Sequence, residues 1–240
     1  MLIKTKLRTL DNVEISVNHY INGFDRVLIF MPGWFMTKDS RCFSEMCETF
    51  GLGADIIGLD FRGHGESGGF YSFTTWELLD VRAAVNFARK HYKKISLVGF
   101  SLGASLAILF GSKSTLIDKI IAVSPACDFN KIENYFWKKE AWLPTLQKAE
   151  IKRWLSVRPS AIIRRKIKPI DVVDKIKCPT LFIAGENDPT VYPWHTEKLF
   201  EKATCDKKYV LFKHCNHAED LFLAEKEKFI NLCGSWLFGD

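Results

Sequence analysis

The chain has 240 residues, of which 47% are hydrophobic and 26% charged, so it can bury one sizeable core and fits one domain better than two. Aromatic residues make up 13% of the sequence, which excludes the low hydrophobicity of a disordered protein. The formal net charge is +6, and no run of about 18 apolar residues occurs, so we expect no membrane span.

The N-terminus and the cysteines both bear on the compartment. The first eight residues contain no apolar run of secretory length, so we expect no signal peptide. The seven cysteines are scattered, odd in number and never spaced as Cys-x-x-Cys. This pattern favours free thiols in a reducing compartment over a disulfide framework or a zinc site, and hence a cytoplasmic protein.

Apolar periodicity predicts a sheet flanked by helices. Two alternating stretches, 3–9 and 13–20, are typical of an antiparallel hairpin at a sheet edge. Continuous apolar runs follow, which indicate strands covered on both faces, at 27–30, 55–59, 95–98, 120–123, 180–184 and 209–212. Helices are predicted at 76–91, 102–110 and 219–238. This alternation predicts a doubly wound, mostly parallel α/β sheet.

Residues from about 128 to 170 interrupt this alternation. Between Asp128 and Lys168 the sequence has eleven Lys or Arg against four Asp or Glu, with several Trp, Tyr and Phe among them. The segment exceeds an ordinary connection in length, and we interpret it as a helical lid inserted into a single domain over 1–240. Its charge is typical of a solvated helix face, with anion attraction as the alternative. The densest basic cluster is Arg164, Arg165, Lys166 and Lys168.

A nucleophile motif follows the strand predicted at 95–98. Gly99-Phe100-Ser101-Leu102-Gly103 lies between this strand and the next helix, the context that a Gly-x-Ser-x-Gly nucleophile elbow requires. Such a sharp turn exposes the serine hydroxyl at the C-terminal end of the sheet. The residues two before and two after must be small, because the strand and helix backbones come close. The pattern therefore predicts Ser101 as a nucleophile.

A serine nucleophile needs a base, and the base needs an acid that orients it. After a nucleophile elbow these residues follow in the order Ser, acid, His. Asp188 lies in the loop after the strand at 180–184, and His217 lies in the loop after the strand at 209–212. Both loops are expected at the sheet edge that carries Ser101, so we predict Ser101, His217 and Asp188 as a catalytic triad.

Each of these assignments has an alternative. Asp128 also follows a strand and is a second candidate for the acid, and Glu186 is a third. His214 lies closer to its strand than His217 and is the alternative base. His64 follows Arg62-Gly63 in a turn and is expected to form hydrogen bonds to the backbone.

A tetrahedral oxyanion needs two backbone N–H donors. Leu102, which follows the predicted nucleophile, should supply one of them. Trp34, in the Met31-Pro32-Gly33-Trp34 loop after the strand at 27–30, is the candidate for the other. The alternative is that Pro32-Gly33 forms a simple turn.

These motifs together resemble the α/β hydrolase superfamily over nearly all 240 residues. The resemblance rests on Pro32-Gly33-Trp34, Asp60-Phe61-Arg62-Gly63-His64-Gly65-Glu66-Ser67, the elbow, Gly185 to Asp188, and His217. It is strongest to the small esterase branch of cinnamoyl or feruloyl esterases, monoacylglycerol-lipase-like and serine-aminopeptidase-like hydrolases. It implies the triad, the Trp34 and Leu102 oxyanion hole, and a lid. The family usually has His-Gly where this chain has Pro32-Gly33.

The resemblance implies a serine hydrolase that cleaves carboxylic esters through an acyl-enzyme, with no cofactor and no metal. An acyl thioesterase is the alternative, because a basic lid suits an anionic carrier, and a non-catalytic ligand receptor is a further one. The expected partner is a small-molecule ester, and we expect neither nucleic acid nor stable membrane insertion. A fold of this kind hosts many chemistries, so the substrate stays open.

Overall fold

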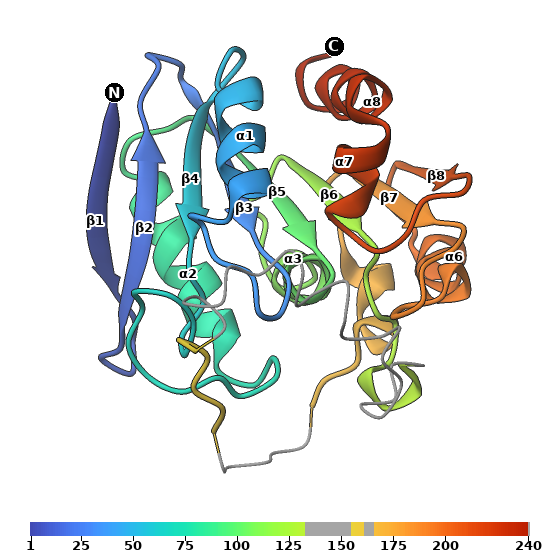
Figure 1. Cartoon of the computed structure of the whole chain (residues 1–240), viewed down its shortest axis with the longest axis horizontal. Helices are drawn as coiled ribbons and strands as arrows, with labels where there is room; N and C mark the ends of the chain where they lie inside the picture. Colours follow the sequence, from blue (N-terminus) through green and yellow to red (C-terminus); the bar gives the residue numbers. More distant parts are fainter. Residues whose placement is uncertain (133–154, 161–165, 240) are drawn as a thin grey trace.

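The computed structural model describes residues 1–132, 155–160 and 166–239. Within these residues eight strands form one sheet in the order β1-β2-β4-β3-β5-β6-β7-β8 (Figure 1). β2 pairs antiparallel with β1 and with β4, and all other neighbours are parallel. The predicted α/β architecture is therefore confirmed. The strands are β1 (Leu2–Arg8), β2 (Glu14–Tyr20), β3 (Arg26–Met31), β4 (Asp55–Leu59), β5 (Lys94–Phe100), β6 (Lys119–Val123), β7 (Thr180–Gly185) and β8 (Lys207–Phe212).

Helices cover both faces of the sheet (Figure 1). One layer holds α1 (Arg41–Phe50), α7 (Asp220–Ala224) and α8 (Lys226–Phe238), and the other holds α2 (Glu77–Ala88), α3 (Leu102–Gly111) and α6 (Pro193–Lys202). Alternate strand residues reach opposite layers: Ile29 packs with the second group of helices and Phe30 with the first. Both positions must therefore be apolar, which explains the continuous hydrophobic runs.

The C-terminal helix differs from its prediction. The sequence predicts one helix over 219–238, but two helices occur, because Glu225 leaves the helical region with φ −130° and ψ 57°. Phe222 and Phe229 are seven residues apart and both fully buried. The apolar period therefore continues across the break, and periodicity alone does not reveal it.

Part of the predicted insertion lies outside the described residues, namely 133–154 and 161–165, and with it the predicted helical lid. The described segment 155–160 crosses two loops of the domain. The Tyr71 N–H donates to the Arg158 carbonyl at 2.8 Å, and the Arg158 N–H donates to the Gly63 carbonyl at 2.8 Å. This segment therefore joins the loops that follow β4 on the way to α2.

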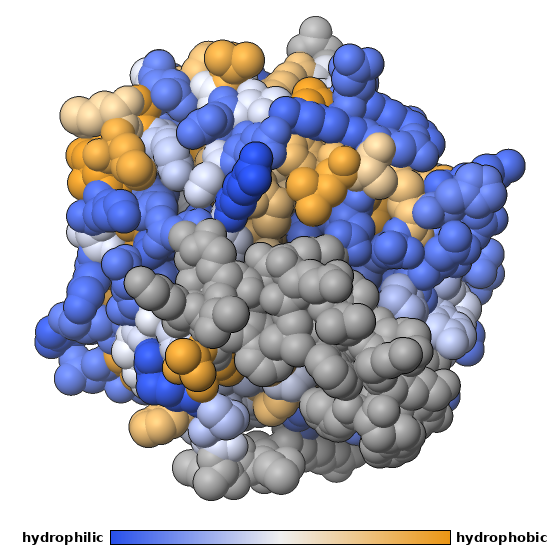
Figure 2. Space-filling view, in the orientation of Figure 1, coloured by the Kyte–Doolittle hydropathy of each residue, from blue (hydrophilic) through white to orange (hydrophobic). Residues whose placement is uncertain are grey.

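The surface of the described residues is mainly polar. Among the residues coloured by hydropathy in Figure 2, hydrophilic side chains predominate, and one group of hydrophobic ones lies near the start of β1, where Met1, Leu2 and Ile3 are exposed. None of the helices within the described ranges combines the length and apolarity that crossing a membrane requires. All seven cysteines are free thiols, as the sequence predicts.

Replacing Phe229 with Ala tests how α8 is held to the sheet. The Phe229 ring is fully buried and contacts Phe100 of β5, Phe212 of β8 and Phe222 of α7 at centroid distances of 5.9–6.2 Å. The cavity left by truncation should lower the free energy of unfolding by about 3–5 kcal/mol, measured by urea unfolding. Leu223→Ala, at a position 52% exposed, is the matched control and should change it by less than about 0.5 kcal/mol. A loss under about 1 kcal/mol in Phe229→Ala would contradict this packing.

Candidate active site

Ser101 stands on a strained turn between β5 and α3. Its backbone is left-handed, with φ 52° and ψ −110°, a conformation that non-glycine residues rarely adopt. A Cβ atom on Gly99 would collide with the Gly103 carbonyl, and one on Gly103 would collide with the Met31 carbonyl. The end of β5, the start of α3 and the loop after β3 are therefore in backbone contact here, and only glycine fits at both positions.

Asp188 and His217 are in direct contact. Asp188 Oδ2 lies 2.6 Å from His217 Nδ1. The other carboxylate oxygen, Oδ1, accepts the Thr190 and Val191 backbone N–H groups at 2.9 and 2.8 Å. Asp188 is buried, so this oxygen is fixed by the backbone and Oδ2 is left facing the imidazole. The carboxylate is thus placed to hold the ring with Nδ1 protonated and Nε2 unprotonated.

Hydrogen bonds from backbone N–H groups hold these loops to the same sheet edge. The Asn187 N–H donates to the Cys215 carbonyl at 2.9 Å, which joins the loop after β7 to the loop after β8. The Ala218 N–H donates to Ser124 Oγ at 3.1 Å, directly after β6. The Ser101 N–H in turn donates to the carbonyl of Val123, the last residue of β6. Ser101 and the His217 loop are therefore both anchored at the C-terminal end of β6.

The alternative acids have other partners. Asp128 accepts from Lys168 Nζ at 2.9 Å and from the Asn130 N–H at 3.0 Å. Glu186 accepts the backbone N–H of His214 at 2.9 Å. The structure therefore joins Asp188 with His217, and places Asp128 and Glu186 in different contacts.

A cavity of about 340 Å³ opens beside Ser101. Its described lining includes both residues predicted for the oxyanion hole, Trp34 and Leu102. Three aromatic rings in contact form one wall: Trp34 and Phe73 meet edge to face with their centroids 5.0 Å apart, and Tyr71 and Phe73 are tilted with their centroids 4.5 Å apart. The cavity is small for a ligand pocket and mainly apolar, with the serine hydroxyl as a polar group in its lining.

His64 supports the loop that carries Trp34. Its Nε2 accepts the Phe35 N–H at 3.3 Å, which leaves Nδ1 to donate to the Arg62 carbonyl at 3.2 Å. The predicted backbone hydrogen bonding of His64 is thereby confirmed. Burial of the ring lowers the pKa of His64 to about 4, so the side chain is neutral at pH 7 and keeps the acceptor that Phe35 needs.

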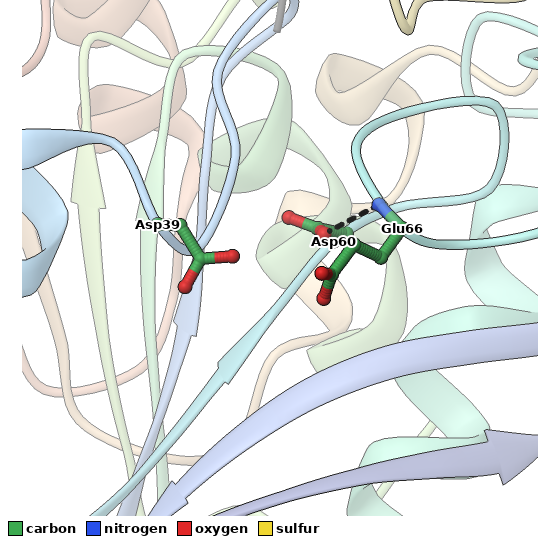
Figure 3. A group of neighbouring side chains, drawn as sticks. All are labelled: Asp39, Asp60 and Glu66. Carbon is green, nitrogen blue, oxygen red and sulfur yellow. Dashed lines mark hydrogen bonds between the residues drawn. The ribbon is translucent and has the colours of Figure 1, made fainter.

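A cluster of charges built around the buried Lys38 and Asp60 lies under the same loop. Figure 3 shows the carboxylates of Asp39, Asp60 and Glu66 turned towards a common space. The Lys38 ammonium is completely buried and donates to one oxygen of each, at 2.7, 3.0 and 2.9 Å. Burial opposes the charge of Lys38, but attraction to these carboxylates outweighs it and raises the Lys38 pKa. Lys38 therefore supplies the cation of this cluster and ties the loop after β3 to the loop after β4.

The low pKa of His64 predicts how stability depends on pH. An unfolded histidine titrates near 6.5, so between pH 6.5 and 4 the unfolded chain binds a proton that the folded state does not. The contribution of neutral His64 to the free energy of unfolding is therefore complete above about pH 6.5. It decreases as the pH falls, by roughly 3 kcal/mol in all. Urea unfolding at several pH values should give His64→Gln a lower free energy of unfolding than wild type at pH 7.5. This free energy should then decrease less in the variant than in wild type as the pH is lowered. The exposed His91→Gln is the control, and parallel profiles for wild type and His64→Gln would contradict the assignment.

Comparison with known proteins places this geometry in a family. Residues 28–232 match the model of the alpha/beta hydrolase family. YqkD of Bacillus subtilis is 30% identical over 173 residues, which cover 70% of this chain and 57% of that protein. The probable alcohol acetyltransferase of Cyberlindnera jadinii is 31% identical over 103 residues, 42% of this chain and 28% of that protein. The chain thus spans about half or less of the length of these two relatives.

Solved structures share the fold at lower identity. An esterase from Pyrococcus furiosus superposes with a TM-score of 0.83 at 24% identity, covering 99% of this chain and 91% of the esterase. The family match extends from β3 to α8 and so includes the elbow and the loops of Asp188 and His217. The chain belongs to the α/β hydrolase family.

Proposed function

We propose that this protein hydrolyses carboxylic esters through an acyl-enzyme, with Ser101 as nucleophile, His217 as base and Asp188 as the acid that orients the base. The observation that carries the proposal is the 2.6 Å contact between Asp188 and His217 at the sheet edge where Ser101 stands on its left-handed turn. The apolar cavity beside Ser101 gives room for the substrate. An acid bound to the base, and a serine on a sharp turn at the same sheet edge, support this assignment of roles.

In the proposed reaction, His217 Nε2 takes the Ser101 proton while Oγ bonds to the ester carbonyl carbon. The tetrahedral intermediate collapses as the His217 imidazolium protonates the departing alcohol, which leaves an acyl-serine. Water then attacks the acyl carbon and gives its proton to His217, and the carboxylic acid leaves as Ser101 regains a proton. Asp188 stays ionised throughout and stabilises the imidazolium through Oδ2.

The oxyanion proposal assigns the developing charge to the backbone N–H groups of Leu102 and Trp34. Leu102 is the first residue of α3, so its N–H has no acceptor within the helix, and the helix N-terminus favours negative charge. The loop of Trp34 has Pro32 where related proteins usually have histidine. Here the contacts of His64 with Phe35 and of Lys38 with Asp60 support the loop. These contacts support the Trp34 loop without a histidine side chain at position 32.

Transfer of the acyl group to an alcohol is a second candidate. It is favoured by the similarity to the probable alcohol acetyltransferase, which matches 42% of this chain. Both reactions share the acyl-enzyme and differ only in whether water or an alcohol attacks it. The ratio of acid to ethyl ester formed from a p-nitrophenyl ester in buffer containing ethanol separates them.

Ser101→Ala is expected to remove turnover of p-nitrophenyl esters, with a loss on the order of 10⁶ in kcat, because no other group can form the acyl bond. Intact-protein mass spectrometry should show one fluorophosphonate adduct on wild type and none on the variant. Ser112→Ala, at the other end of α3, is the control and should keep both activity and labelling. A tenth of the wild-type rate in Ser101→Ala would rule out this nucleophile.

Asp188→Asn should lower kcat by about 10⁴, because it reverses the tautomer of the base. The Thr190 and Val191 N–H groups hold one oxygen, so the asparagine keeps its carbonyl there and turns its NH₂ towards His217 Nδ1. The imidazole must then carry its proton on Nε2, where it cannot accept from Ser101.

Two matched variants check this acid against its alternatives. Asp128→Asn and Glu186→Gln remove the same charge from residues bonded to Lys168 and His214. Steady-state kinetics should give both variants kcat values within about threefold of wild type, as expected of carboxylates outside the reaction. A larger loss in Asp128→Asn than in Asp188→Asn would show that the acid is misassigned.

A further inference from the structure

The cavity beside Ser101 contains a cation that the proposed reaction does not use. Among the described residues that line it, Lys166 is the only charged one. The others are apolar, aromatic or hydroxyl-bearing, and they include Ser101, Leu102 and Trp34. Lys166 and Ser101 therefore border the same space of about 340 Å³.

Aromatic rings fix the position of this ammonium. Lys166 Nζ lies 4.6 Å from the centroid of Phe73 and 5.9 Å from that of Phe129. Phe73 itself packs against both Trp34 and Tyr71. A cation over the face of an aromatic ring is attracted to it, but the ring supplies no full negative charge. Among the described residues, the groups that hold Lys166 at the cavity wall thus leave its charge largely uncompensated.

Asp128 and Glu77 already have partners of their own. No carboxylate of the described residues forms an ion pair with Lys166, whereas Lys168 is bonded to Asp128 at 2.9 Å. Glu77 favours the charge of Lys166 from a distance, but its oxygens accept the Ser72 N–H at 2.6 Å and the Ser72 hydroxyl at 2.9 Å. Burial dominates and lowers the pKa of Lys166. An anion in the cavity would supply the missing compensation.

We propose, on the basis of the esterase function above, that Lys166 selects esters carrying an anionic group, such as a carboxylate, a few bonds from the reacting carbonyl. The short separation follows because Lys166 and Ser101 line one small cavity. The apolar and aromatic lining would contact the carbon chain between the two groups, and the ammonium would bind the carboxylate at its end. Half-esters of dicarboxylic acids have this chemistry on the acyl side, and esters of hydroxy acids have it on the alcohol side.

Paired substrates that differ only in charge test the proposal. Hydrolysis of monoethyl glutarate is compared with that of diethyl glutarate for the acyl side, and 3-acetoxypropionate with its ethyl ester for the alcohol side. Lys166→Met should lower kcat/KM for the anionic member of at least one pair by about tenfold or more, and change the neutral member by less than about twofold. The pair that responds identifies the side of the ester that carries the anion.

Lys168→Met is the matched control, because it removes the same charge two residues away from a lysine that has a carboxylate partner. It should change both members of a pair by similar small factors. If Lys166→Met lowers the anionic and neutral members equally in both pairs, or if Lys168→Met reproduces its selectivity, the proposal is overturned. Equal losses in Lys166→Met would show that Lys166 contributes only packing. The same selectivity in Lys168→Met would show a general effect of positive charge on anionic substrates.

A binding experiment separates this proposal from the esterase function. Calorimetry on Ser101→Ala measures affinity for monoethyl glutarate and 3-acetoxypropionate without turnover, and the double variant Ser101→Ala/Lys166→Met should bind the preferred anion at least tenfold more weakly. This loss supports anion recognition even if no ester is hydrolysed. Equal affinity in the two variants for both anions overturns it, even if esterase activity is found.

Discussion

The close contact of β5, α3 and the loop after β3 is the constraint on which the candidate site depends. At this point Gly99 and Gly103 leave no room for a side chain, and Ser101 between them takes a left-handed backbone conformation that costs of order 1–3 kcal/mol. The strain is maintained by the buried strand and the apolar helix on either side. Because the loop after β3 touches the same turn, Trp34 and Ser101 border one cavity. A larger residue at position 103 would separate them.

Buried polar groups then keep that loop in place. Lys38 brings a completely buried charge under the sheet edge, where desolvation is costly unless every partner is present. The three carboxylates around it come from the loops after β3 and β4, so the hydrogen bonds of Lys38 connect these two loops. His64 adds a neutral acceptor for the Phe35 N–H in the same region. Both groups restrict the loop whose N–H is proposed to bind the oxyanion, which is where a site of this kind needs rigidity.

The two proposals assign a reactive end and a recognition end to the same cavity. Ser101 and the proposed oxyanion donors line the part of the cavity next to the ends of β3 and β5. The aromatic wall of Trp34, Tyr71 and Phe73 includes the ring over which the Lys166 ammonium lies. An apolar cavity binds many short acyl groups with little discrimination, since one methylene changes affinity only modestly. A single fixed cation in such surroundings discriminates more strongly, because its charge is poorly screened and its aromatic neighbours provide only part of the compensation. The proposed selectivity therefore follows from the same packing that shapes the pocket.

The sequence by itself determined the sheet, the elbow and the edge at which the candidate residues meet, because strand burial and the small residues around Ser101 appear as local patterns. The bounds predicted for β4 agree with the structure, and the other strands differ by a few residues at their ends. Local patterns did not reveal the break at Glu225, since Phe222 and Phe229 stay in helical register across it. Only the tertiary structure decided which acid meets which histidine: Asp188 and Glu186 are two residues apart, yet they face His217 and the His214 backbone respectively. It also decided that Lys166 borders the cavity while Lys168 pairs with Asp128. In the sequence both lysines belong to one basic cluster, because burial and partners depend on contacts between residues far apart in the chain.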